Sequence, residues 1–117
     1  MISEIDSPAA LLRALIRIPS VNPDGDPGSP HTGEVLCAQF VGDFLARECG
    51  AAVTYDEVLP GRPNVIARLT PHAPGAEKPR ILFGPHTDTV SVAGMTIDPF
   101  GGEIRDGAGE PKVAEGI

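Results

Sequence analysis

The sequence is poor in aromatic residues, in cationic residues and in long apolar runs. Its 117 residues include no Trp, one Tyr and four Phe, so any core must be built from aliphatic side chains. Lys and Arg total 9 against 16 Asp and Glu, which gives a net charge of −7. Nucleic acids and anionic membrane surfaces attract basic patches, so we expect neither as a partner. No apolar run reaches the roughly 18 residues that a membrane-spanning helix requires.

Cysteine is also scarce, with Cys37 and Cys49 as the two examples. Both fall in one predicted helix, where a rise of about 1.5 Å per residue places them roughly 18 Å apart. A disulfide requires Cα atoms within about 7 Å, so we expect free thiols that pack as core residues. Free thiols favour a reducing compartment, and the acidic segment 1–6 lacks the basic start of a signal peptide. The sequence therefore predicts a cytoplasmic protein.

Glycine and proline, by contrast, are abundant. Fourteen Gly and 13 Pro residues predict a loop-rich chain, while an apolar content of 41% excludes a disordered tail. A length of 117 residues suits one small domain. We find neither an internal repeat nor a linker, so residues 1–117 are predicted to form a single domain with no second one.

Two helices are predicted from apolar residues at helical spacing. Ser7 is a candidate cap for a first helix that begins at Pro8 and ends before Pro19. A longer helix is predicted from about Glu34 to Gly50, since Gly is the typical left-handed residue after a helix. Its apolar stripe is predicted to contain Leu36, Cys37, Phe40, Val41, Phe44 and Leu45.

Four strands are predicted, at residues 52–58, 64–69, 81–83 and 100–105. The first two are expected to pair antiparallel because the connection between them is short. The fourth ends in an Asp-Gly turn at 106–107, a hairpin signal. Residues 20–30 are dense in turn residues and read either as a connector or as a segment beside the substrate. Together these elements predict an α/β fold with a mixed sheet and flanking helices.

The most informative stretch lies at the third predicted strand. Residues 81–83 are apolar and bounded by turn residues, which predicts a buried strand that Gly84 and Pro85 end. His86 and Asp88 follow at i and i+2, so in an extended backbone they share one face. This face lies past the carboxyl end of the strand, where ligands bind in open α/β sheets.

His86 with Asp88 is the strongest candidate for chemistry. A neutral imidazole is a common zinc ligand, and a carboxylate on the same face can accept its second N–H or bind metal itself. The simpler alternative is a histidine satisfied by local hydrogen bonds. A zinc site needs three or four protein ligands, but His31 and His72 are expected at the surface. Spacing singles out none of the candidate carboxylates Glu103, Asp106, Glu110 and Glu115.

Four stretches together resemble one enzyme family. They are residues 15–23 (LIRIPSVNP), 61–67 (GRPNVIA), 82–90 (LFGPHTDTV) and 98–107 (DPFGGEIRDG). In this order they resemble the co-catalytic zinc hydrolase family of aminoacylases, acetylornithine deacetylases, succinyl-diaminopimelate desuccinylases and glutamate carboxypeptidases. The resemblance runs from about residue 8 to 107. It implies the N-terminal part of a zinc-peptidase-like catalytic domain.

The resemblance also implies roles for two residues. His86 matches a zinc ligand, and Asp88 matches the catalytic-site carboxylate that orients this histidine. Members of the family bind two zinc ions per site. They hydrolyse an amide bond of an N-acyl amino acid or a peptide through metal-activated water, as deacylases or as metallopeptidases of the carboxypeptidase type. The expected partner is therefore a small N-acyl amino acid or peptide substrate.

The sequence departs from the family pattern in two places. Pro85 separates Gly84 from His86, and no turn or bridging Asp of the family type is recognisable after Gly107. The general base and the later metal ligands are likewise unrecognisable, so we expect residues 1–117 to be an inactive N-terminal fragment of a metallohydrolase catalytic domain. The alternatives are a non-catalytic α/β binding or interaction module that retains the scaffold, or a truncated or frame-altered product without a function of its own.

Overall fold

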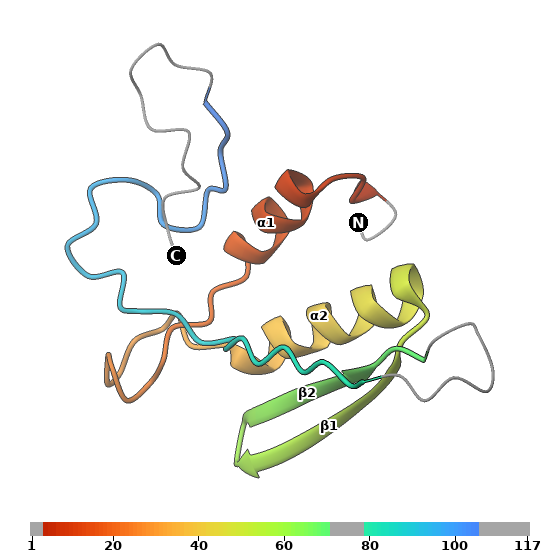
Figure 1. Cartoon of the computed structure of the whole chain (residues 1–117). Helices are drawn as coiled ribbons and strands as arrows, with labels where there is room; N and C mark the ends of the chain where they lie inside the picture. Colours follow the sequence, from red (N-terminus) through yellow and green to blue (C-terminus); the bar gives the residue numbers. More distant parts are fainter. Residues whose placement is uncertain (1–3, 71–78, 106–117) are drawn as a thin grey trace.

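The computed structural model describes residues 4–70 and 79–105 (Figure 1). Its regular elements are α1 (Pro8–Ile16), α2 (Glu34–Cys49), β1 (Ala52–Leu59) and β2 (Arg62–Arg68). Two helices precede two strands, and α2 packs against the strands, which confirms the α/β class. No helix among residues 4–70 and 79–105 has the length and apolarity needed to cross a membrane.

Helix α1 begins and ends where local signals in the sequence place it. The Ser7 hydroxyl accepts a hydrogen bond from the Ala10 N–H at 3.2 Å, and Pro8 occupies the first turn. The helix ends at Ile16, whose side chain is buried. The predicted cap and both predicted boundaries are therefore confirmed.

Helix α2 also matches its predicted bounds, but its buried face is narrower than predicted. Gly50 adopts the left-handed conformation (φ 66°), and the Ala51 N–H donates to the Leu45 carbonyl at 3.0 Å. Cys37 is buried, whereas Leu36 is 60% exposed and Cys49 is exposed, so the prediction of a core position is wrong for these two. The covered face carries mainly small residues, namely Cys37, Ala38 and Gly42.

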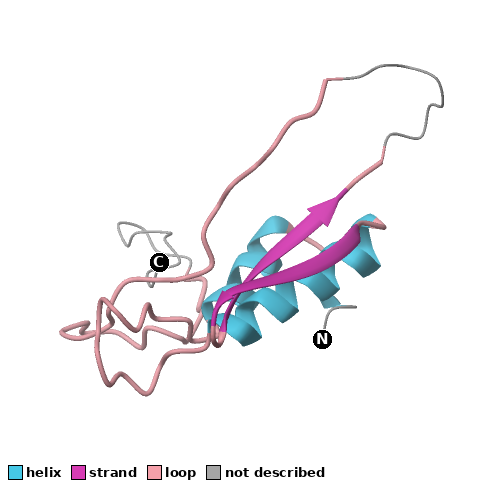
Figure 2. Cartoon of the chain, turned by 90° about the horizontal axis from the view of Figure 1, so that it is seen from below, coloured by secondary structure: helices cyan, strands magenta, loops and turns pink. Residues whose placement is uncertain are grey.

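Strands β1 and β2 form an antiparallel pair that packs against α2 (Figures 1 and 2). Ala52 pairs with Arg68, and the turn passes through Gly61 at φ 73°. Gly42 lets the helix approach the sheet closely, since a Cβ there would lie 3.1 Å from Val53 Cγ1. The predicted antiparallel pairing is confirmed.

The prediction of a buried strand at residues 81–83 is wrong. Figure 2 shows this segment running as a single extended line away from β1 and β2. Ile81, Leu82 and Phe83 are 78%, 93% and 84% exposed. An apolar strand is buried where neighbouring strands and covering helices enclose it. In the described part of the chain the sheet consists of β1 and β2, and residues 81–83 do not pair with either.

Two further strand predictions have different outcomes. Residues 100–105 are described and form no strand, so the fourth predicted strand is wrong; its predicted turn at 106–107 lies outside the described residues. Parallel pairing, which a mixed sheet requires, is confined within the described ranges to one isolated bridge between Val21 and Thr89. The apolar residues that are buried are Ile16, Val21, Cys37, Ala38 and Ala51.

Substitution of Leu82 separates the sequence prediction from the structure. Because the side chain is 93% exposed, Leu82→Ser should change the free energy of unfolding by less than about 0.5 kcal/mol. The matched control Ile16→Ser, at a residue only 6% exposed, should lower it by about 2–5 kcal/mol. Urea denaturation measures both. A loss above about 2 kcal/mol at Leu82 would mean that this segment is buried in solution.

A second stability test concerns the start of α2. A Cβ added to Gly33 would lie 2.5 Å from the Pro19 carbonyl oxygen, and a backbone atom cannot move aside without shifting residues 19–22. Gly33→Ala should therefore lower the free energy of unfolding by about 1–3 kcal/mol. Gly84→Ala is the control, since a Cβ there meets nothing within 4 Å. Equal urea midpoints for the two variants would contradict the close approach.

Candidate functional site

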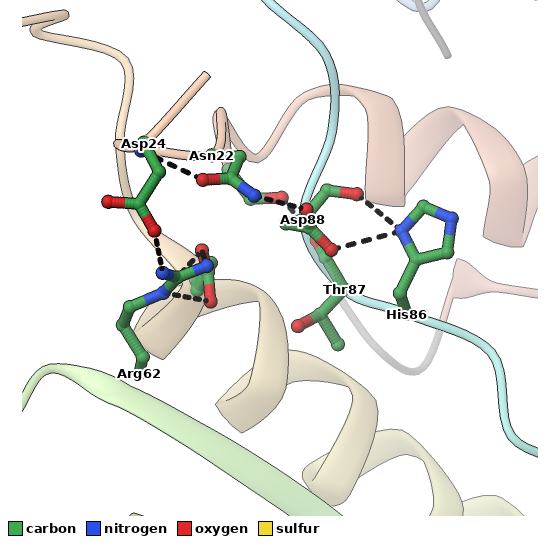
Figure 3. Close-up of polar contacts among 8 residues, drawn as sticks. Asn22, Asp24, Arg62, His86, Thr87 and Asp88 are labelled. Atoms are coloured by element: carbon green, nitrogen blue, oxygen red, sulfur yellow. Dashed lines mark hydrogen bonds and ion pairs between the residues drawn. The ribbon is translucent and has the colours of Figure 1, made fainter. Parts of the chain in front are cut away.

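His86 and Asp88 contact each other directly, as their spacing predicted (Figure 3). The Nδ1 atom of His86 lies 2.8 Å from the Asp88 backbone oxygen and 3.0 Å from Asp88 Oδ1. Both neighbours of Nδ1 are acceptors, so Nδ1 carries the proton and the neutral ring has its lone pair on Nε2. The His86 side chain is 81% exposed, and Nε2 is directed away from Asp88. The pair presents an imidazole nitrogen with the polarity of a metal ligand.

A third residue, Asn22, completes the hydrogen bonding of Asp88. The Asn22 Nδ2 amide donates to Asp88 Oδ2 at 2.8 Å, so each carboxylate oxygen has its own partner. This hydrogen bond is the main cause of a lowered pKa of the Asp88 carboxyl, and the neighbouring His86 lowers it further. Asp88 is therefore held in its charged form beside the His86 N–H.

The sequence analysis missed Asn22, because it lies in the turn-rich loop 20–30 and is 66 residues away from Asp88. One signal was available. Asn22 belongs to the stretch 15–23, and Asp88 to the stretch 82–90, two of the four motifs that carry the family resemblance. Joint occurrence of two motifs indicates that both serve one site, but it does not indicate which atoms meet.

Residues 20–22 form a platform that packs against residues 87–89, rather than a simple connector. The Ser20 hydroxyl donates to the Thr87 carbonyl, and the backbones of Ser20 and Asn22 exchange hydrogen bonds with Thr89 at 3.0 and 2.9 Å. Ser20 and Val21 are 2% and 0% exposed. The two segments are thus locked in register on either side of Asp88.

An ion-pair cluster anchors this platform to the helix and the sheet (Figure 3). Arg62, in β2, contacts Glu34 Oε1 at 3.0 Å and Asp24 Oδ2 at 2.9 Å. Glu34 lies in the first turn of α2 with its side chain only 10% exposed. The Asp24 backbone N–H in turn donates to Asn22 Oδ1 at 2.8 Å. A continuous line of hydrogen bonds therefore joins β2 to His86.

A pocket of about 310 Å³ opens beside His86. Its lining combines residues of the platform with the segment that follows His86, and consists of Asn22, Gly25, His86, Asp88, Thr89, Val90 and Ser91. The size is at the lower limit of small-molecule pockets. The arrangement can hold a small polar group next to the imidazole.

Two further candidate ligands lie in the described part of the chain, and neither joins the site. His31 packs against the Phe100 ring at a centroid distance of 4.9 Å, and Glu103 pairs with Arg105 at 3.0 Å. Within residues 4–70 and 79–105 no group of three His, Cys, Asp or Glu side chains is placed to hold a metal ion. The other candidates, namely His72, Asp106, Glu110 and Glu115, lie outside the described residues. Both cysteines are free thiols, as predicted.

Replacement of Asn22 tests the charge state of Asp88. Asn22→Ala removes the donor that lowers the pKa of Asp88, so this pKa should rise toward its ordinary value. A depressed carboxyl pKa contributes stability above the ordinary value and loses it as the pH falls through the folded-state pKa. The variant should therefore lose less unfolding free energy than the parent chain between about pH 6 and pH 2.

Two measurements follow this change. Carbon NMR of the Asp88 carboxyl gives the pKa, and urea denaturation at both pH values gives the stability difference. Asn64→Ala, at an exposed amide in β2, is the matched control and should alter neither quantity. An unchanged Asp88 pKa in folded Asn22→Ala would contradict the hydrogen bond.

Comparison with known proteins gives one consistent result. Succinyl-diaminopimelate desuccinylases of Rhodospirillum centenum, Methylorubrum extorquens and Methylorubrum populi are each 37% identical over 86% of this chain. The chain spans about a quarter (24%) of the length of these relatives. No family model matches the chain, and no solved structure matches it significantly. The similarity nevertheless confirms the resemblance carried by the four motifs, because succinyl-diaminopimelate desuccinylases are among the enzymes of the family that those motifs resemble.

Proposed function

We propose that this chain forms one corner of a zinc-dependent amide-hydrolysing site of the deacylase type. The carrying observation is the His86–Asp88 contact, in which the carboxylate holds Nδ1–H and leaves Nε2 as the outward lone pair. The relatives are named for removal of a succinyl group from succinyl-diaminopimelate, which is hydrolysis of an amide bond. The proposed substrate class is accordingly a small N-acyl amino acid or peptide.

The chemistry of His86 and Asp88 fits a zinc ion to which His86 contributes one ligand. Zinc accepts neutral imidazole nitrogen, and a histidine ligand typically donates its other N–H to a carboxylate, as His86 does to Asp88. A bound zinc ion lowers the pKa of water and polarises the substrate carbonyl. Within the described residues His86 would hold the metal, while Asp88 fixes the ring and keeps the proton on Nδ1.

One histidine does not make a zinc site, since three or four protein ligands are needed. No group of three candidate ligands is present in the described ranges. We therefore propose that residues 1–117 act as the N-terminal part of a larger catalytic domain and are inactive by themselves. The two free thiols support placement in the reducing cytoplasm.

A chimera tests this function. The matching quarter of the Rhodospirillum centenum desuccinylase is replaced with the residues of this chain that align with it, and hydrolysis of succinyl-diaminopimelate is followed with zinc supplied. The chimera should be active, and His86→Ala should lower kcat by more than roughly 100-fold, because loss of a ligand exceeds the effect of losing its hydrogen-bond partner. The isolated 117-residue chain should not hydrolyse the substrate.

The chimera experiment has a matched control at a second histidine. His31→Ala is the matched histidine control, because His31 packs on Phe100 and not on Asp88, so kcat should be retained. Full activity of the His86→Ala chimera would overturn the assignment of His86. A folded chimera that binds substrate without hydrolysing it would instead favour a non-catalytic binding module.

A further inference from the structure

We propose that Asn22 is the positioning residue of this site, and that Asp24 and Arg62 hold Asn22 in place. These residues together with Asp88 are called the positioning network below. The inference deepens the proposed function, on which its relevance to zinc rests. The geometry itself is independent of any metal.

Asn22 fixes the plane of the Asp88 carboxylate. A carboxylate with a single partner can rotate about its terminal bond, but here Oδ1 lies 3.0 Å from His86 Nδ1 while Oδ2 accepts from Asn22 Nδ2 at 2.8 Å. Two partners on opposite oxygens leave one orientation in which both hydrogen bonds form. The ring of His86 is 81% exposed and thus barely restrained by packing, so it takes its orientation from this carboxylate together with the Asp88 backbone oxygen.

Asn22 is itself held at both ends of its amide. Its Oδ1 accepts the Asp24 N–H at 2.8 Å, and its Nδ2 donates to Asp88. These two bonds fix which end of the amide is oxygen and which is nitrogen, so the side chain presents a donor, not an acceptor, to the carboxylate. The Asn22 backbone N–H donates to the Thr89 carbonyl at 2.9 Å, and this bond helps to set the distance between the two segments.

A neutral donor is well suited to this position. An Arg or Lys on Asp88 Oδ2 would neutralise the carboxylate and weaken its pull on the His86 N–H. The Asn22 amide satisfies the same oxygen and leaves the full negative charge facing the imidazole. The cation of the network, Arg62, lies farther along and pairs with Asp24 and Glu34 instead.

Arg62 connects the positioning network to the layered part of the fold. It lies in β2, reaches Asp24 at 2.9 Å and Glu34 at 3.0 Å, and its side chain is 23% exposed. Its two carboxylate partners come from the loop and from α2, so a displacement of the loop breaks a charge-assisted contact. The position of the loop that carries Asn22 is therefore fixed relative to α2 and β2.

The test replaces the Asn22 amide donor with a carboxylate acceptor of nearly the same shape. Asn22→Asp keeps an oxygen for the Asp24 N–H but replaces the donor to Asp88 with a second carboxylate. Asn64→Asp makes the same change of charge at an exposed residue of β2. Asn22→Ser covers the case in which Asn22→Asp fails to fold. The serine retains an acceptor and adds no charge, but its shorter side chain cannot reach Asp88.

The first readout is the tautomer of His86 in the zinc-free chain, from ring nitrogen NMR shifts at about pH 8, where an ordinary histidine is neutral. The ratio of Nδ1–H to Nε2–H should fall roughly 3- to 10-fold in folded Asn22→Asp and Asn22→Ser, as expected for one lost hydrogen bond. Asn64→Asp should leave it unchanged. An unchanged ratio in the folded Asn22 variants would overturn the proposal.

The second readout uses the active chimera described above. Asn22→Ser should lower kcat roughly 10-fold with little change in KM, because loss of a partner that orients a metal ligand costs about 10- to 100-fold. Loss confined to KM would overturn a positioning role. If the chimera is inactive with Asn22 intact, the proposed function fails, while the tautomer ratio still decides the role of Asn22.

Discussion

The structure around His86 depends on the docking of residues 20–22 against residues 87–89. Ser20 and Val21 are almost fully buried at this junction, although they lie in a loop and 66 or more residues from their partners. The extended segment before His86 runs apart from β1 and β2 (Figure 2), so the backbone exchange with Thr89 places the segment relative to the described chain. A site built on loops becomes specific only where such a contact fixes them.

The ion pairs of Arg62 with Asp24 and Glu34 fix the geometry of the loop and add little to the free energy of unfolding. A carboxylate as enclosed as Glu34, at 10% side-chain exposure, is costly to desolvate, and pairing offsets that cost without a large net gain. The start of α2 favours the negative charge of Glu34, which further compensates its burial. What the cluster supplies is geometry, because Arg62 can bridge Asp24 and Glu34 only when loop, helix and strand stand in one arrangement.

How much the sequence predicts depends on whether a signal is local. Ser7, Pro8 and Gly50 act on their own neighbours, so the bounds of α1 and α2 could be read directly. The His86–Asp88 contact likewise follows from i, i+2 spacing. Burial, by contrast, depends on what packs against a segment and not on its own residues alone. The apolar run 81–83 has the composition of a core strand, yet it is exposed because no other element covers it in the described part of the chain. For the same reason spacing could not find Asn22, whose partner lies 66 residues away.

The two ring nitrogens of His86 have different surroundings, which distinguishes His86 from an ordinary surface histidine. A surface imidazole gains little by ordering its ring, because water can serve both nitrogens. Here one nitrogen has two protein acceptors within 3.0 Å, and the acceptor side chain is itself fixed by Asn22 and charged beside the ring. The opposite nitrogen is directed away from these partners (Figure 3). Ordering one side of an exposed ring costs conformational entropy and gains little stability by itself, so the proposed role of the other nitrogen as a ligand atom accounts for an order that stability alone does not require.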